Sequence, residues 1–214
     1  MFFDELSMSK FESLFFKLVK KYGKARNQWR LWCKRNKNEK EREEVAIGAI
    51  LTQRTSWQNV EKAIENLKRA GLLSLRKISL THQKKLTVFL KPTGFYQRKA
   101  ECLLSFSKFV IKNYGSINDM KKVRLESLRE ELLKINGIGK ETADSILLYA
   151  LDKPIFVIDE YTRRIVKREH LTTDLSYDDL QKIFQDNLKK DFKIYQDFHA
   201  LLVIECQSEK IKRI

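Results

Sequence analysis

Asp159 follows directly on the apolar run 155–158, which reads IFVI, and precedes a polar, basic segment. Because such a run is expected to be buried, the carboxylate should lie at the edge of a core, where its ionisation can be tuned. A carboxylate in this position can stabilise a positive charge or activate a water molecule. Its alternative role is to cap the helix that the polar segment begins, and one residue can do both.

A second candidate lies just upstream, where Gly137 and Gly139 flank Ile138 between two apolar helical segments. Glycines permit positive φ and the close approach of another backbone. The next helix begins at once, so its unpaired N–H groups lie at the positive end of the helix dipole, beside Lys140 and Thr142. This pattern favours a phosphate site formed by Gly137, Gly139, Lys140 and Thr142. The alternative is an ordinary helix corner with a glycine C-cap.

The charge of the chain points to a polyanionic partner. Lys and Arg number 43 against 28 Asp and Glu, which gives a formal net charge of +15. Nucleic acid is the simplest partner for such an excess, and a charge that only maintains solubility or touches anionic lipid is the alternative. No stretch reaches the roughly 18 to 20 apolar residues of a membrane span. The N-terminal residues also lack a signal-peptide pattern, so we expect a cytoplasmic protein without membrane contact.

The cysteines predict no metal centre. Cys33, Cys102 and Cys206 are far apart, odd in number and form no CxxC pair or cluster with histidines. We therefore expect reduced, packed thiols and neither a structural zinc site nor an iron–sulfur cluster.

Helical periodicity dominates the chain, which contains only two prolines and seven glycines, and predicts an all-α class built from many short helices. The best strand candidate, 154–158, is short. The charged stretch 34–44 is expected to be a loop or a solvated first helical turn. The apolar helical faces are predicted within residues 11–19, 45–51, 60–67, 97–113, 180–188 and 192–204.

Three segments in order resemble one family. Residues 135–164 resemble the helix–hairpin–helix plus Gly/Pro-Asp (HhH-GPD) signature of the endonuclease III-like DNA base-excision glycosylases. Residues 49–55, which read AILTQRT, resemble the family segment whose Gln enters the duplex. Residues 93–100, which read TGFYQRKA, resemble its Gly-Leu-Tyr…Lys-Ala loop and helix. The resemblance covers roughly residues 44 to 170 at family-like spacing.

The resemblance implies an all-α, endonuclease III-like fold of two helical lobes with DNA in the cleft between them. One lobe is a six-helix bundle, 35–150, that ends in the helix–hairpin–helix. The other combines 1–34 with 151–214 and carries the catalytic Asp159. A monovalent cation held by hairpin carbonyls is a further family feature. The iron–sulfur loop of many relatives needs four clustered cysteines near the C-terminus, where this chain has only Cys206, so no cofactor is implied.

The resemblance also predicts a mechanism. Bifunctional relatives place a nucleophilic Lys two positions after the second hairpin glycine, where this chain has Glu141. Lys140 comes one residue early, and one step round a helix turns the side chain by about 100 degrees. We therefore expect a monofunctional glycosylase in which Asp159 stabilises positive charge on the sugar and orients or deprotonates the attacking water. A shifted hairpin that makes Lys140 the nucleophile of a bifunctional enzyme is the alternative.

Base flipping needs side chains that fill the vacated stack, and Gln53 and Phe95 stand in the two family wedge positions. The alternatives are a hydrogen-bonding residue at a helix end for Gln53 and a core aromatic for Phe95. Trp29 and Trp32 precede the bundle, where a subgroup of relatives carries base-pocket tryptophans. Their alternative role is to anchor the contact between lobes.

The lesion follows from the same subgroup. The lack of a lysine nucleophile and of a cluster resembles the endonuclease III-like 3-methyladenine glycosylases. Their cationic bases have weak glycosidic bonds and need an aromatic pocket rather than strong leaving-group protonation. One departure is that Phe198-His199 is followed by Ala200, without the subgroup's nearby lysine. We expect a monomer that acts on double-stranded DNA with damaged bases. A mismatch or oxidised-base glycosylase and a non-catalytic lesion-binding protein are the alternatives.

Overall fold

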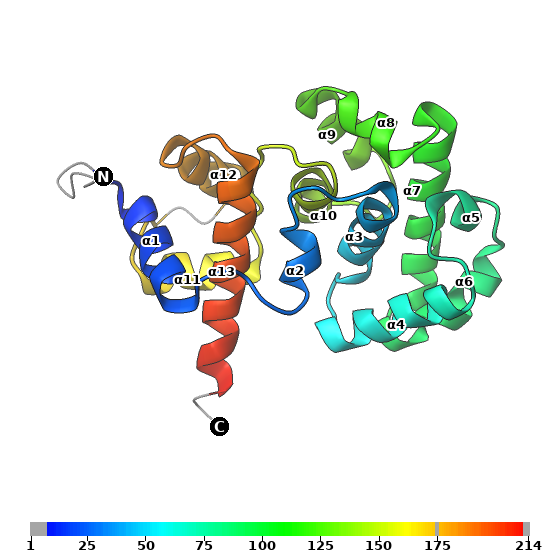
Figure 1. Cartoon of the computed structure of the whole chain (residues 1–214), viewed down its shortest axis with the longest axis horizontal. Coiled ribbons are helices and arrows are strands. Elements are labelled where there is room, and N and C mark those ends of the chain that lie inside the picture. The colour runs from blue at the N-terminus through cyan, green and yellow to red at the C-terminus, as the bar shows by residue number, and fades with distance from the viewer. Residues whose placement is uncertain (1–7, 174–175, 212–214) are drawn as a thin grey trace. The chain divides into compact units, whose positions relative to one another are not determined.

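The computed structural model describes residues 8–173 and 176–211, and every regular element in them is a helix (Figure 1). The expected all-α class is therefore confirmed. The chain forms two compact units, which we call the terminal unit, Met1–Cys33 with Pro154–Ile214, and the bundle unit, Lys34–Lys153. The ends of the predicted second lobe, 1–7 and 212–214, lie outside the described residues, as do 174–175.

The bundle unit is built around α3, whose residues 45–51 are almost completely buried on all sides. A helix that is apolar all round belongs in a core, and α3 packs against α4, α7, α8, α10 and η2. The helices of this unit are α3 (Glu39–Leu51), α4 (Trp57–Arg69), α5 (Leu75–Ser79), α6 (Gln83–Leu90), η1 (Lys91–Thr93), α7 (Tyr96–Tyr114), α8 (Ile117–Lys122), α9 (Leu125–Leu133), α10 (Lys140–Ser145) and the π-helix η2 (Ile146–Ala150).

The expectation that 34–44 is solvated holds for Lys34, Glu39 and Lys40, which are exposed. It was wrong for three charged residues that are buried: Lys37, Arg42 and Glu43. Lys37 Nζ and Arg42 Nη1 lie 3.3 and 2.8 Å from the carboxylate of Asp152, which Lys121 also reaches at 2.9 Å. The positive charges of Lys37 and Arg42 are buried because they are paired with Asp152, as burial of an ion requires. Their partner lies more than a hundred residues away in the sequence, so no local pattern could reveal it.

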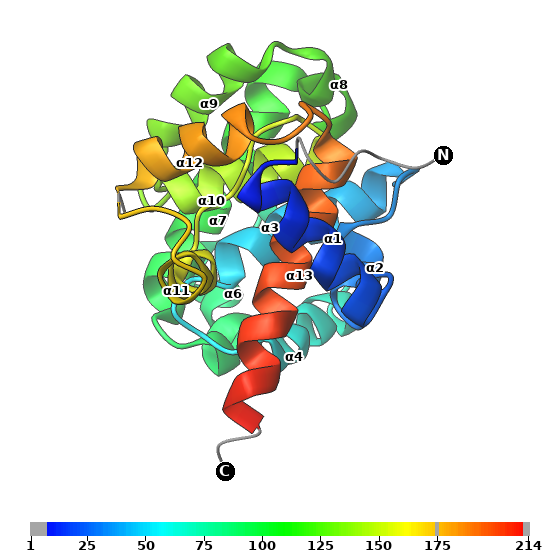
Figure 2. The same cartoon turned by 90° about the vertical axis from the view of Figure 1, so that its left-hand side faces the viewer.

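The terminal unit contains α1 (Lys10–Tyr22), α2 (Trp29–Trp32), α11 (Glu160–Arg168), α12 (Tyr177–Asp186) and α13 (Phe192–Ile211). Helix α13 packs against both α1 and α11 (Figure 2). The run 155–158 is buried, as expected, but the strand candidate 154–158 forms no strand. Its backbone is satisfied by side chains of α12 instead: Phe156 N–H donates to Gln185 Oε1 at 3.0 Å and Phe156 O accepts from Gln181 Nε2 at 2.6 Å.

Among the described residues, no helix combines the length and the apolar content that crossing a bilayer requires.

Candidate functional site

Asp159 is the N-cap of α11. Its extended backbone, with φ −112° and ψ −178°, lets the carboxylate accept a 2.7 Å hydrogen bond from Thr162 N–H. The predicted capping role is thus observed. The second carboxylate oxygen, Oδ2, lies 3.4 Å from His199 Nε2 on α13. The side chain is 14% exposed, so part of the carboxylate remains accessible from outside the core.

The surroundings of Asp159 favour the ionised carboxylate. Burial acts to raise its pKa, but the neighbouring His199 imidazole and the hydrogen bond from Thr162 N–H outweigh it, so the pKa lies below its ordinary value. The positive end of the α11 dipole acts in the same direction. At neutral pH the group is therefore an anion, which can stabilise a neighbouring positive charge.

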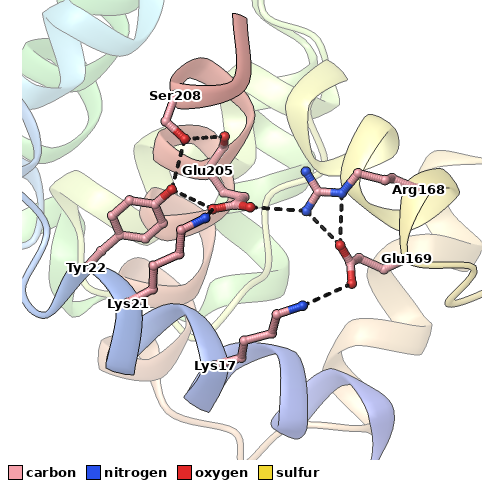
Figure 3. A network of polar contacts seen from close by, with 7 residues as sticks. All are labelled: Lys17, Lys21, Tyr22, Arg168, Glu169, Glu205 and Ser208. Atoms are coloured by element: carbon pink, nitrogen blue, oxygen red, sulfur yellow. Dashed lines mark hydrogen bonds and ion pairs between the residues drawn. The ribbon is translucent and has the colours of Figure 1, made fainter. Parts of the chain in front are cut away.

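Helix α11 is fixed to α13 at both of its ends. At the start, Asp159 pairs with His199. At the end, Arg168 Nη2 lies 3.4 Å from Glu205 Oε1 (Figure 3). Glu205 in turn accepts hydrogen bonds from Lys21 Nζ at 2.6 Å and Tyr22 OH at 2.5 Å, which join α1 to the same network. The position of Asp159 is thus set by a helix that cannot shift along α13 without breaking both contacts.

The structure brings one predicted pocket residue against His199, the neighbour of Asp159. The Trp29 ring meets His199 edge-on, with ring centroids 6.0 Å apart at 79°, and Trp32 packs edge-on against Trp29 at 5.6 Å. Both tryptophans are buried. A cavity of about 280 Å³ is lined by Trp29 together with Lys21, Lys24 and Arg26, and Asp159 is not among its lining residues. A pocket role for Trp29 and Trp32 therefore stays a prediction.

Sequence reasoning assigned no role to His199. Its separation from Asp159 by forty positions leaves no spacing signal, and the Phe198-His199 pair suggests only a nearby lysine, which this chain lacks.

Glycine stands at the two hairpin positions for different reasons. Gly137 has φ +88°, and a Cβ there would lie 3.1 Å from Cys102 Cβ and 3.2 Å from its Sγ, so both the turn and its packing on α7 require glycine. Gly139 is the N-cap of α10 with φ −91°, and a Cβ there would meet nothing within 4 Å. The protein itself thus does not need glycine at 139. Close approach of an outside group to this backbone would need it.

The hairpin is held from both sides. Arg129 on α9 pairs with the buried Asp144 on α10 through two bonds, Nε–Oδ1 at 2.7 Å and Nη2–Oδ2 at 3.1 Å. From the loop after α3, Gln53 Nε2 donates to Gly137 O and to Thr142 Oγ1, both at 2.9 Å. Bidentate Arg–carboxylate pairs fix geometry well, so the angle between α9 and α10 is well defined.

These contacts bear on the roles predicted for Thr142 and Gln53. Thr142 is buried and its hydroxyl faces Gln53, so its side chain does not project toward a phosphate. The Gln53 amide is bound to the hairpin, as its hydrogen-bonding alternative anticipated. Lys140 and Glu141, by contrast, are both exposed at the start of α10.

Phe95 lies at a loop tip. Its side chain is 62% exposed, and its backbone adopts the left-handed conformation with φ 45°, directly after Gly94 with φ 63°. Positive φ is uncommon for a bulky residue and costs energy, so this loop is fixed in a strained form that presents the ring outward. The alternative that Phe95 is a core aromatic was wrong.

The three cysteines, all within the described residues, form no disulfide. Burial raises the pKa of Cys102, which packs on Gly137, to about 11. No group of three His, Cys, Asp or Glu residues suited to a metal ion occurs within the described ranges.

Comparisons with known proteins identify the family and the fold of this chain. The family model of the HhH-GPD superfamily base excision DNA repair protein matches residues 47–190. A Methanocaldococcus jannaschii protein named as a DNA repair glycosylase is 50% identical over 169 residues, 78% of this chain and 77% of that protein. The crystal structure of the H. pylori 3-methyladenine DNA glycosylase bound to 1,N6-ethenoadenine has a TM-score of 0.78 and 30% identity, over 94% of this chain and 99% of that one. A trapped endonuclease III–DNA covalent intermediate has a TM-score of 0.70 over 92% and 86% of the chains, and its 18% identity supports a likeness of fold alone.

Proposed function

This chain belongs to the HhH-GPD superfamily of base excision DNA repair proteins and is a DNA N-glycosylase, and we propose that it hydrolyses the glycosidic bond of an alkylated base. The resemblance carried by residues 49–55, 93–100 and 135–164 is confirmed at the level of the family. The lesion, the lack of strand cleavage and the roles of individual residues are our proposals.

Asp159 carries the proposal. Release of a base leaves positive charge on the sugar, and a fixed, ionised carboxylate stabilises that charge as it develops. The same group orients or deprotonates the water that attacks the sugar. A low pKa makes it a weak base, so charge stabilisation and water orientation are its main contributions.

The hairpin supplies the grip on the DNA backbone. The N–H groups at the start of the helical run 140–150 and the exposed Lys140 offer donors and positive charge to a phosphate, and Gly139 leaves room for it. Phe95 is exposed in a fixed loop, which suits a ring that stacks in the space left by a flipped base. Gln53 can enter the duplex only by giving up its two bonds to the hairpin, so we assign the main wedge role to Phe95.

Two observations support hydrolysis without strand cleavage on an alkylated base. By the resemblance to the family, Glu141 stands where bifunctional relatives carry the lysine nucleophile, and a carboxylate cannot form a Schiff base. The structural neighbour with 30% identity acts on 3-methyladenine, a base whose weakened bond needs little protonation. Trp29 and Trp32 are the aromatic residues that we propose for stacking on such a cationic ring.

An excision panel tests the proposal. Duplexes carrying 3-methyladenine, 8-oxoguanine, uracil, a thymine mismatch or adenine opposite 8-oxoguanine are incubated with the enzyme, and strands are resolved with and without alkali. We expect abasic sites only in the alkylated duplex, with breaks only after alkali. Activity confined to a non-alkylated base would refute the substrate assignment.

Borohydride trapping tests the mechanism separately. We expect no covalent protein–DNA adduct. An adduct that Lys140→Ala abolishes, and that Lys134→Ala on the same hairpin leaves intact, would establish the bifunctional alternative.

A further inference from the structure

Lys99 is a buried lysine whose partners are backbone carbonyls. It is 2% exposed and lies in the first turn of α7. Its Nζ donates to Leu51 O at 2.9 Å and to Thr93 O at 2.8 Å. The only cause of its pKa shift is burial, which lowers the pKa to about 8, so no acidic side chain in the described part of the chain offsets its charge. A buried charge without a carboxylate costs stability, which a packing role alone would not require.

The two carbonyls lie where the Gln53 loop and the Phe95 loop begin. Leu51 is the last residue of α3 and stands two positions before Gln53, which binds the hairpin. Thr93 is the last residue of η1 and stands two positions before Phe95. One ammonium group therefore joins two loops whose anchoring carbonyls, Leu51 O and Thr93 O, are 42 positions apart in the sequence.

We propose that Lys99 is a positioning residue that fixes the Phe95 loop to the Gln53 loop. The wedge ring and the phosphate-binding hairpin are thereby held at a fixed distance and orientation for base flipping. The proposal rests on the wedge and hairpin roles given above. It assigns Lys99 no contact with DNA.

The local backbone shows why a clamp is needed. Each loop contains a residue other than glycine at positive φ, Arg54 at 50° and Phe95 at 45°. Such conformations persist only where the surroundings over-determine them. A cation is well suited to this task at Leu51 O, because the last carbonyls of a helix have no intrahelical partner and lie at the negative end of its dipole.

The clamp predicts a pH effect of a distinctive kind. Above about pH 8 the ammonium loses its charge, and neutral donors make weaker hydrogen bonds, so the loops should loosen. The folded-state pKa lies below the ordinary 10.5, so the unfolded chain binds more protons between the two values. The contribution of Lys99 to stability therefore rises with pH over the same window in which base flipping falls.

The experiment measures base flipping with 2-aminopurine placed beside an abasic-site analogue in a duplex. Its fluorescence reports the local unstacking without requiring any base to be excised, so the result does not depend on the proposed lesion. Wild-type protein is compared with Lys99→Met and Lys99→Arg between pH 7 and 9.5. The matched control is Lys153→Met, because Lys153 also donates to a backbone carbonyl, Val123 O at 2.6 Å, and also has a pKa lowered mainly by burial.

We expect wild-type flipping to fall with a midpoint near pH 8. Lys99→Met should flip about 10- to 100-fold less at pH 7, the effect of losing charge-assisted hydrogen bonds, and should show no such midpoint. Lys99→Arg should retain most flipping and remain insensitive to pH. Binding to undamaged duplex should change little in either variant.

Wild-type flipping by Lys99→Met at pH 7 would overturn the proposal. So would a loss that merely follows thermal stability, as in Lys153→Met. If Lys99→Met fails to fold, the wild-type profile decides, since flipping that is constant from pH 7 to 9.5 excludes the clamp. Failure of the wild type to excise any base of the panel would instead count against the proposed function.

Discussion

Alanine substitutions at the two hairpin glycines should have opposite consequences. In Gly137→Ala the new Cβ lies 3.1 Å from Cys102 Cβ at a residue with φ +88°. The left-handed conformation costs an alanine about 1 to 2 kcal/mol, and the steric overlap adds about 1 to 2 kcal/mol. The free energy of unfolding should therefore fall by roughly 2 to 4 kcal/mol, which lowers Tm by roughly 5 to 15 °C for a chain of this length.

Gly139→Ala should leave stability nearly unchanged. Its φ of −91° suits alanine, and its Cβ meets nothing within 4 Å. The poorer N-cap and the reduced entropy of the unfolded chain offset each other to within about 1 kcal/mol. A methyl group at the proposed phosphate site should nevertheless weaken DNA binding about tenfold and reduce the salt dependence by about one phosphate contact.

Denaturant unfolding and fluorescence anisotropy with a labelled duplex at several salt concentrations measure both effects. Wild-type DNA affinity in Gly139→Ala would refute the assignment of the hairpin as a phosphate site. Destabilisation of Gly139→Ala as large as that of Gly137→Ala would show that the free protein, rather than its ligand, requires this glycine.

Three further substitutions test other parts of the site. Loss of the imidazole beside Asp159 in His199→Gln should raise the pKa of the carboxylate and move the acidic limb of the excision profile to higher pH; an unmoved limb would contradict this. Phe95→Ala should reduce excision about 10- to 100-fold without loss of stability. Val88→Ala, which truncates another exposed apolar side chain of the bundle unit, should leave the excision rate unchanged. Glu205→Gln should lower the free energy of unfolding by about 1 to 3 kcal/mol at pH 7, as judged by urea titration.

The destabilisation caused by Glu205→Gln should depend on pH in a definite direction. Burial acts to raise the pKa of Glu205, but Lys21, Tyr22 and Arg168 lower it overall. A carboxylate with a lowered folded-state pKa stabilises the fold above its ordinary value of 4.5, and this contribution is lost as pH falls through the folded-state pKa. The difference between wild type and Glu205→Gln should therefore shrink in acid. An equal difference at pH 7 and pH 3 would refute this account of the network.

Features set by nearby residues were predictable from the sequence. The apolar face of α7 follows from its period, and the hairpin follows from two glycines between apolar helices. The capping role of Asp159 follows from a carboxylate between a buried run and a polar helix start. Each of these signals spans fewer than twenty residues.

Features set by distant partners were not predictable. Lys37 and Arg42 read as solvated because Asp152 is remote in sequence. Thr142 carries a hydroxyl at a helix start, yet this hydroxyl accepts a hydrogen bond from Gln53, 89 positions earlier. The His199 contact with Asp159 and the Lys99 contact with Leu51 depend in the same way on how helices pack. Local patterns therefore identified the acid and the hairpin but not the residues that position them.

The proposed chemistry depends on Asp159 acting through its charge. Asp159→Asn removes the charge, but asparagine caps helices as well as aspartate does and can still accept the Thr162 N–H, so α11 should keep its start. Asp186→Asn, which alters an exposed carboxylate on α12 of the same unit, is the matched control.

The decisive measurement is the single-turnover rate of base release from an alkylated duplex, with the affinity for an abasic-site duplex measured in parallel. We predict that Asp159→Asn loses base release by at least about a hundredfold, as removal of a charge-stabilising group does, while its affinity stays within about threefold of wild type. Asp186→Asn should match wild type in both. Base release by Asp159→Asn at the wild-type rate would contradict the central claim.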